Sequence, residues 1–151
     1  MKHWLMKSEP DECSIDDVLR AAGHKTAWSG VRNYQARNYM LKEMSVGDGV
    51  LFYHSSCPEP GIAGLAEVAS KAYVDASQFD RKSPYYDPAS KKAEPRWWNV
   101  DVKALKKVPL IPLARLRSEK VLKNMVTLRP GNRLSITPVT EAEWKHIQGM
   151  L

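Results

Sequence analysis

The chain has 151 residues, of which 43% are hydrophobic, and its formal net charge of +6 corresponds to a pI near 9.3. This length and composition indicate one globular domain over residues 1–151 and argue against disorder. No apolar run approaches the roughly 18 residues of a membrane span, and charged residues interrupt the apolar patch of the N-terminal segment MKHWLMKSEP. We therefore expect a soluble intracellular protein with no signal peptide and no membrane partner.

The cysteines and histidines lack the spacing of metal sites. Cys13 and Cys57 are isolated, which predicts two reduced thiols and argues against zinc fingers and disulfides. The four histidines show neither HxxH nor HExxH spacing. Basic residues are densest from Arg96 to Arg133, where a polyanion-binding surface and a solvated surface are equally good interpretations. The sequence thus predicts no metal and no cofactor.

In chain order, the first predicted elements are a strand and a helix. A short apolar run over His3–Lys7 predicts an early buried strand. Ser14 can cap a helix over Ile15–Ala22, because two aspartates occupy its first turn and Gly23 follows its end. The polar stretch that follows, as far as Thr26, is expected to be a loop.

The segment WSGVRNYQARN at residues 28–38 opens the second predicted helix and gathers two aromatic rings, two arginines and three amides. The helix is expected to start near Val31 or Asn33 and to end about Glu43. Its buried face would be formed by Asn33, Ala36, Met40 and Met44. A buried amide needs a partner, so Asn33 either ties down a loop or faces a ligand. So many planar, hydrogen-bonding groups suggest that a planar ligand binds there.

The middle of the chain predicts a hairpin and a long strand. Val50–His54 carries apolar side chains on both faces, and Ile62–Val68 is its expected hairpin partner, with Gly64 admitting a close backbone approach. A polar loop over Asp75–Pro95 follows and contains the sequence SPYYDP. Beyond it, the alternation over Trp97–Val108 predicts one long strand.

The last third predicts one or two short helices over Pro112–Met125 and a late strand over Leu134–Val139. Thr140 and Glu143 then form a capping box for a C-terminal helix. Strands with intervening helices indicate an α+β domain. We expect a small curled mixed sheet, or open β-barrel, of about five to six strands with helices packed around it.

Six stretches in this order resemble the EVE domain family, specifically its thymocyte nuclear protein 1-like branch, over essentially the whole chain. They are HWLMKSEP at 3–10, WSGVRNYQARN at 28–38, FYHSS at 52–56, EPGIAG at 59–64, SPYYDP at 83–88 and RLSITPV at 133–139. The resemblance implies a PUA-like fold related to YTH domains, which bind N6-methyladenosine in RNA. It also implies a pocket for one flipped, modified base. EVE domains are associated with modified cytosines, such as 5-methyl- and 5-hydroxymethylcytosine in DNA, and some members are suspected to act on RNA.

The resemblance to YTH domains also assigns residues to this pocket. A Lys-Ser strand end and a Trp-Ser step border the YTH pocket, and an aromatic side chain from a later loop closes it. Glu9 stands where YTH domains have an asparagine that contacts the base edge, which argues against adenine and suits the N4 amino group of cytosine. The predicted base-pocket residues are Lys7, Ser8, Glu9, Trp28, Ser29, Asn33, Tyr34, Tyr53, His54, Tyr85 and Tyr86. Those expected at the rim or on phosphate groups are Arg32, Arg37, Lys82 and Arg133.

Several of these residues have a purely structural alternative. Trp28 is either a pocket wall or a core residue, and Tyr34 either stacks with Arg37 at the rim or covers the sheet. Both Arg32 and Arg37 could bind phosphate or form surface ion pairs. Of the neighbours Phe52 and Tyr53, which point to opposite faces of their strand, one should be core and the other could border the pocket.

Three classes of function follow. The first is a non-enzymatic reader of a modified base in DNA or RNA, with an RNA-binding accessory role in RNA modification or processing as its variant. The second is an enzyme, in which His54 with Cys57, or Glu9 with Asp11 or Glu12, would be the reactive pair. No third orienting group and no phosphate-binding glycine loop accompany these pairs. The third is a small-molecule or peptide-binding module with an aromatic groove.

We expect the first of these, with no catalysis. The expected partner is nucleic acid that carries a modified base, while the identity of any partner enzyme stays open. The chain lacks a basic N-terminal extension, which favours a bacterial, cytoplasmic protein; a eukaryotic one would be nuclear.

Overall fold

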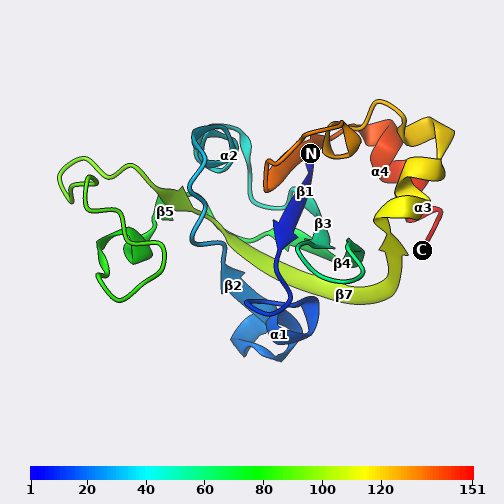
Figure 1. The fold of residues 1–151 in the computed structure, drawn as a ribbon. Helices are drawn as coiled ribbons and strands as arrows, with labels where there is room; N and C mark the ends of the chain where they lie inside the picture. The colour runs from blue at the N-terminus through cyan, green and yellow to red at the C-terminus, as the bar shows by residue number, and fades with distance from the viewer.

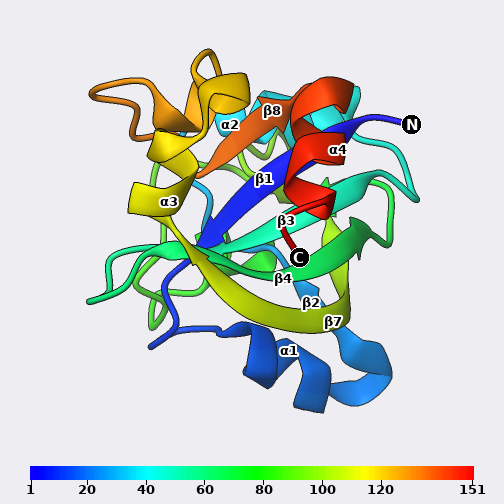
Figure 2. The ribbon, with the colours of Figure 1, turned by 90° about the vertical axis from the view of Figure 1, so that its right-hand side faces the viewer.

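A computed structural model describes all 151 residues and is built around a curled mixed sheet of six strands that does not close (Figures 1 and 2). The strand order is β2-β7-β4-β3-β1-β8, and β1 and β3 form its one parallel pair. The strands are β1 (His3–Ser8), β2 (Lys25–Ala27), β3 (Gly49–His54), β4 (Gly61–Val68), β7 (Asp101–Pro112) and β8 (Ile136–Val139). Two further strands, β5 (Tyr73–Val74) and β6 (Trp98–Asn99), form a separate small sheet.

Four short α-helices lie around the sheet, α1 on one side and α3 and α4 on the other (Figure 2). They are α1 (Ile15–Arg20), α2 (Tyr34–Asn38), α3 (Leu113–Ser118) and α4 (Glu141–Gln148). Single 3-10 turns lie at Ala22–His24, Ala76–Phe79, Lys120–Leu122 and Val126–Leu128. The predicted caps are confirmed, because Ser14 with Asp17 and Thr140 with Glu143 each form a capping box. No helix has the length and apolar character needed to cross a membrane.

Strands β1 and β3 are buried on both faces, and their successive residues belong to two different cores. Met6 and Phe52 pack in a core with residues of α1 and α2. Leu5, Leu51 and Tyr53 pack in a second core with residues of α3 and α4. Because both faces of these strands are covered, their sequences are continuously apolar instead of alternating. Phe52 and Tyr53 are therefore both core residues, which corrects the expectation that only one of them is.

Gly64 admits the close backbone approach that we predicted, and it also allows Ile15 of α1 to pack on β4. A Cβ atom at this position would lie 2.6 Å from the Cδ1 atom of Ile15 and 2.9 Å from the carbonyl oxygen of Lys106. The pairing of β4 with its neighbours shifts register on either side of this residue. The close contact places the first residue of α1 against the middle of β4.

The second helix begins differently from the prediction. Asn33 is the N-cap of α2, and its side-chain oxygen accepts the backbone N–H groups of Gln35 and Ala36 at 2.9 and 3.1 Å. It is exposed and does not belong to the buried face, because a short amide side chain serves a helix best at its cap. After Asn38 the backbone widens into a π turn over Tyr39–Glu43.

The predicted strand over Trp97–Val108 is also divided. It breaks at Val100 into β6, which pairs with β5, and β7, which enters the main sheet. The polar stretch predicted as a loop overlaps β2, a three-residue edge strand that pairs with β7. Such a short polar strand carries no periodic signal. The expected loop over Asp75–Pro95 is an excursion between β5 and β6 that projects at one end of the molecule (Figure 1).

Candidate functional site

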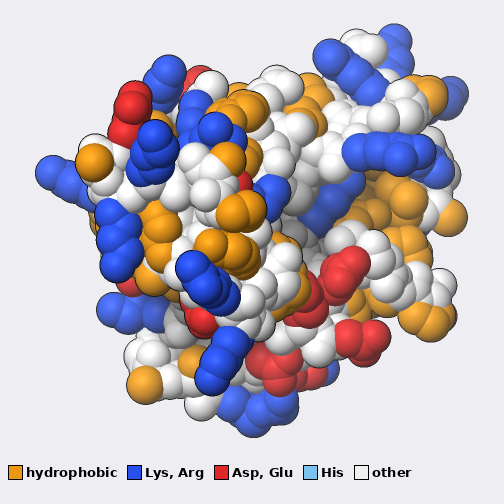
Figure 3. Space-filling model, turned by 60° about the vertical axis from the view of Figure 1, so that its left-hand side comes forward, with side chains coloured by type: hydrophobic (Ala, Val, Ile, Leu, Met, Phe, Trp, Pro, Cys, Tyr) orange, Lys and Arg blue, Asp and Glu red, His pale blue; other side chains and the backbone are white.

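A cavity of about 660 Å³ opens beside the end of β1. Its walls come from chain segments that lie far apart in the sequence: 7–13 and 26–32, two serines after β3, one tyrosine of the excursion, and two residues before β8. A hollow with Lys and Arg side chains along one edge and Asp and Glu side chains along another is visible in Figure 3. The volume lies in the range of small-molecule and cofactor sites.

Eight of the predicted residues line this cavity. They are Lys7, Ser8, Glu9, Trp28, Ser29, Arg32, Tyr85 and Arg133. The predicted residues outside it are Asn33, Tyr34, Arg37, Tyr53, His54, Lys82 and Tyr86. Lining residues that we did not predict are Glu12, Cys13, Thr26, Ala27, Gly30, Val31, Ser55, Ser56 and Ser135. The structure therefore brings together the residues of the Lys-Ser and Trp-Ser steps and places the aromatic loop beside them.

Trp28 belongs to both the cavity and the core. Its side chain is 8% exposed, and its ring meets Phe52 edge-on, with 5.3 Å between ring centroids and an interplanar angle of 84°. Its backbone N–H donates to the carbonyl oxygen of Val100 at 2.8 Å, where β6 gives way to β7. The two interpretations of Trp28 are thus not exclusive, because the residue both lines the cavity and belongs to the first core.

Tyr85 supplies a second aromatic side chain to the cavity lining. Its ring lies so close to the backbone of Gly30 that a Cβ atom there would be 2.8 Å from it. Gly30 also has φ +83°, a conformation that glycine adopts readily. The Tyr85 hydroxyl donates to the Glu12 carboxylate, with 2.6 and 2.8 Å to its two oxygens. This hydrogen bond, with burial, raises the pKa of Tyr85 to about 12.

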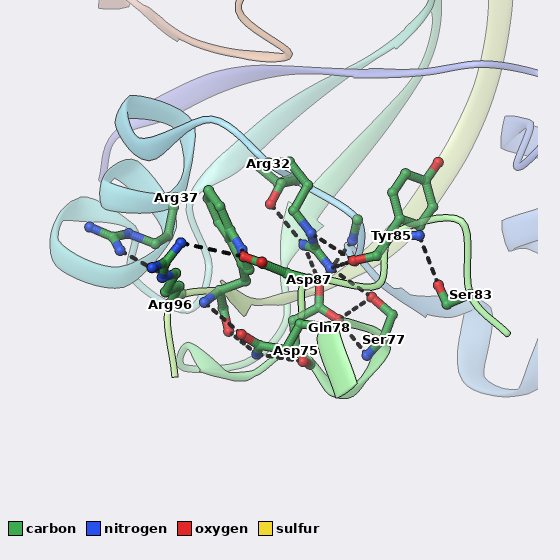
Figure 4. Close-up of polar contacts among 12 residues, drawn as sticks. Arg32, Arg37, Asp75, Ser77, Gln78, Ser83, Tyr85, Asp87 and Arg96 are labelled. Atoms are coloured by element: carbon green, nitrogen blue, oxygen red, sulfur yellow. Dashed lines mark hydrogen bonds and ion pairs between the residues drawn. The ribbon is translucent and has the colours of Figure 1, made fainter. Parts of the chain in front are cut away.

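Arg32 and Asp75 form a polar cluster behind Tyr85 (Figure 4). The Arg32 guanidinium donates to Asp75 at 3.1 Å, to Ser77 at 3.1 Å and to the carbonyl oxygen of Tyr85 at 2.8 and 3.0 Å. Asp75 also accepts the backbone N–H of Gly30 at 2.8 Å. Arg32 is therefore engaged in an ion pair and in holding the excursion, and this ion pair is largely buried, unlike the surface pair that we gave as its structural alternative.

The pKa of Asp75 records this environment. Burial by itself would raise the pKa, since its side chain is only 1% exposed. Hydrogen bonds from Ser77, Gly30 and Arg32 outweigh burial and hold the pKa below its ordinary value. The cluster is thus built for an ionised Asp75.

The other planar side chains of segment 28–38 form a stack that ends at Tyr85. The Arg37 guanidinium lies 4.7 Å from the Tyr34 ring centroid, and Tyr34 stacks on Trp97 at 4.9 Å and 24°. The Arg32 guanidinium lies 5.3 Å from the Trp97 ring and 5.7 Å from the Tyr85 ring. These groups therefore stack mostly on one another. Through Arg32 the stack supports the Tyr85 ring, which is called the aromatic wall of the cavity below.

The remaining predicted residues have structural surroundings of their own. His54 accepts the backbone N–H of Ile15 at 3.1 Å on Nε2, and burial lowers its pKa. Tyr53 lies in the second core, with the Lys7 ammonium 5.7 Å from its ring centroid. Lys82 and Tyr86 lie at the surface of the excursion. Their parts in ligand binding stay predictions.

The charges around the cavity are divided between its edges. Lys7 and Arg133 form no ion pair, and burial lowers the pKa of Lys7. Glu9 and Glu12 supply carboxylates. No three His, Cys, Asp or Glu side chains gather as a metal site. The site can therefore offer hydrogen-bond acceptors at one edge, uncompensated positive charge at another, and aromatic surface.

Comparison with known proteins gives three findings. A family model described as the EVE domain matches residues 2–150. Thymocyte nuclear protein 1 of Homo sapiens is 44% identical over 163 aligned residues, which cover 96% of this chain and 72% of the human protein. The crystal structure of human THYN1 protein in complex with DNA containing 5-methylcytosine has a TM-score of 0.94 and 42% identity, covering 99% of this chain and 97% of that chain.

A more distant likeness concerns the fold alone. The YTH domain of the Zygosaccharomyces rouxii MRB1 protein, solved in complex with N6-methyladenosine RNA, has a TM-score of 0.55 and 14% identity. That match covers 99% of this chain and 85% of the YTH chain.

Proposed function

Because the chain belongs to the EVE domain family, we propose that it binds nucleic acid and takes one modified base, such as 5-methyl- or 5-hydroxymethylcytosine, into the cavity. The observation that carries the proposal is the convergence of Trp28, Tyr85 and two carboxylates with two unpaired cations in one cavity. A relative of almost the same fold, human THYN1, was solved with 5-methylcytosine DNA. The proposed role is binding and not catalysis. In one candidate reactive pair Nε2 of His54 is engaged with Ile15, and in the other Glu12 accepts a hydrogen bond from Tyr85.

Glu9 and Glu12 suit the exocyclic amino group of cytosine. A carboxylate accepts hydrogen bonds from the N4 amino group, whereas it repels a keto oxygen at the same place. Stacking contributes about 1–3 kcal/mol per base, which roughly offsets the few kcal/mol needed to flip a base out of a duplex. A methyl group adds about 1–3 kcal/mol, or 10- to 200-fold discrimination. A polar modification that meets Ser29 would discriminate more strongly.

A salt-controlled titration tests the proposal. One oligonucleotide context carries cytosine, 5-methylcytosine, 5-hydroxymethylcytosine, adenine or N6-methyladenosine, as DNA and as RNA. We expect a preference for a modified cytosine. The RNA series shows whether the domain also binds the modified base in RNA. Equal, weak and steeply salt-dependent binding to all of them would mean binding by charge alone and would contradict the proposal.

Lys7 and Arg133 are proposed to contact phosphate, because their charge has no acidic partner in the protein. Replacing either by glutamine should weaken binding to all oligonucleotides about equally and reduce the slope of log K against log salt by about 1. Lys145→Gln on α4, which lies outside the cavity, is the matched control and should leave the slope unchanged. A Lys7→Gln or Arg133→Gln protein with the wild-type slope would exclude that residue from phosphate contact.

A further inference from the structure

We infer that Glu12 is a positioning residue that holds the Tyr85 ring in place at the edge of the cavity, an inference that rests on the proposed function. Glu12 lies in the segment before α1, and Tyr85 lies 73 residues later in the excursion between β5 and β6. Both residues line the cavity, and the phenol-to-carboxylate hydrogen bond is what joins their two side chains. The bond therefore links the excursion to the segment that precedes α1.

The other contacts of Tyr85 involve its main chain and its ring, not its hydroxyl. Arg32 holds the main-chain carbonyl of Tyr85, and Gly30 lies against the ring. Figure 4 shows the ring projecting away from the Arg32–Asp75 cluster, with the hydroxyl at its far end. At that end, Glu12 is the hydrogen-bond partner. Without Glu12 the main chain of Tyr85 stays held and the ring keeps its contact with Gly30, but no hydrogen bond fixes the hydroxyl and with it the orientation of the ring.

Glu12 also keeps capacity for a ligand. An ionised carboxylate offers about four lone-pair positions, and one phenol O–H uses at most one of them in a linear bond. Glu12 is exposed and forms no ion pair with the protein. The same carboxylate can thus orient the aromatic wall and accept from the amino group of a base stacked on it. This coupling gives a reason why an acidic residue, and not a neutral one, stands at this position.

The contact has a signature in the protein without ligand. The hydrogen bond to Glu12 is the largest cause of the raised pKa of Tyr85, about 12 against an ordinary 10.0. Tyrosine 13Cζ chemical shifts followed by NMR to alkaline pH would show it, with Tyr85→Phe identifying the signal. We expect Tyr85 to titrate closer to 10 in Glu12→Ala and at an intermediate pH in Glu12→Gln, which keeps an acceptor. Identical titration of Tyr85 in the wild type and in Glu12→Ala would overturn the inference.

Binding provides the second test. Tyr85→Phe should weaken binding of a 5-methylcytosine oligonucleotide about tenfold, as expected for one hydrogen bond to a charged group. Glu12→Ala should weaken it further, because this substitution also removes the acceptor for the amino group of the base. The double variant should be little weaker than Glu12→Ala alone, and Glu12→Gln should recover part of the loss. Asp11→Ala, an exposed neighbour outside the cavity, is the matched control and should bind like the wild type.

Independent, additive losses from the two substitutions would also overturn the inference. Failure of the proposed function gives a different result from failure of this inference, because the wild-type protein itself would then show no base preference. The titration of Tyr85 decides the Glu12 contact in either case.

Discussion

Trp28→Ala is expected to abolish selective binding of the modified base and to lower the free energy of unfolding by about 3–5 kcal/mol. The first effect follows because Trp28 is one of two aromatic side chains in the cavity lining. The second follows because the same ring is 8% exposed and packs on Phe52 in the first core. A domain of this size has about 5–15 kcal/mol of stability, so the variant should stay folded at low temperature.

Trp4→Ala separates the two effects. Trp4 belongs to the same core as Trp28 and is 2% exposed, but it does not line the cavity. Its indole N–H also donates to Asp48, so its loss should cost at least as much stability. Urea unfolding and the oligonucleotide titration, both at low temperature, should show two destabilised proteins of which only Trp4→Ala keeps base selectivity. Wild-type selectivity in a folded Trp28→Ala protein would exclude the base pocket proposed here.

Much of the fold could be predicted because local signals agree with tertiary packing. The caps at Ser14 and Thr140, the hairpin of β3 with β4 and the late strand all have residue patterns that no distant contact overrides. The α+β class and the curled mixed sheet are confirmed, as is the EVE family. The boundary between β6 and β7 could not be predicted, because alternation does not reveal that a strand leaves one sheet for another.

Three serines of the cavity, Ser55, Ser56 and Ser135, were missed for a similar reason. Ser55 reaches the site because the parallel register of β1 and β3 pairs Ser8 with His54, and the Ser55 N–H then donates to the Ser8 carbonyl at 3.0 Å. Ser135 lies on the other side of β1, just before β8, and its carbonyl accepts the Lys7 N–H at 2.8 Å. Register between distant strands is a tertiary property, so no local pattern marks these residues as neighbours.

Asn33, Tyr34 and Arg37 were predicted at the site but lie outside the cavity. Their chemistry suggested ligand contact, and each is instead occupied within the protein. Asn33 caps α2, while Tyr34 and Arg37 stack toward Trp97. Trp97 follows the excursion in the sequence. The pattern of segment 28–38 alone therefore does not indicate the partner that completes the stack.

Asp75→Ala should strongly destabilise the protein, although Asp75 does not line the cavity. Removing one partner of a buried ion pair typically costs about 3–5 kcal/mol, because the other charge and its hydrogen-bond donors are left uncompensated. Here those groups are the Arg32 guanidinium, the Gly30 N–H and Ser77. Base-selective binding should weaken as well, since Arg32 positions Tyr85. Asp80→Ala, an exposed aspartate of the same excursion, is the control for urea unfolding and for binding, and should change both far less.

Acidification tests the same cluster without removing atoms from it. The pKa of Asp75 is lowered in the folded protein from an ordinary value of 3.8, so its contribution to stability is complete above that pH and is lost as the pH falls toward the folded pKa. The free energy of unfolding of the wild type should therefore fall below about pH 4. Asp75→Asn should be less stable at neutral pH and fall less steeply over this range, because its amide cannot titrate. Parallel curves for the two proteins would mean that Asp75 is not ionised against Arg32, and the support proposed for the aromatic wall would fail with it.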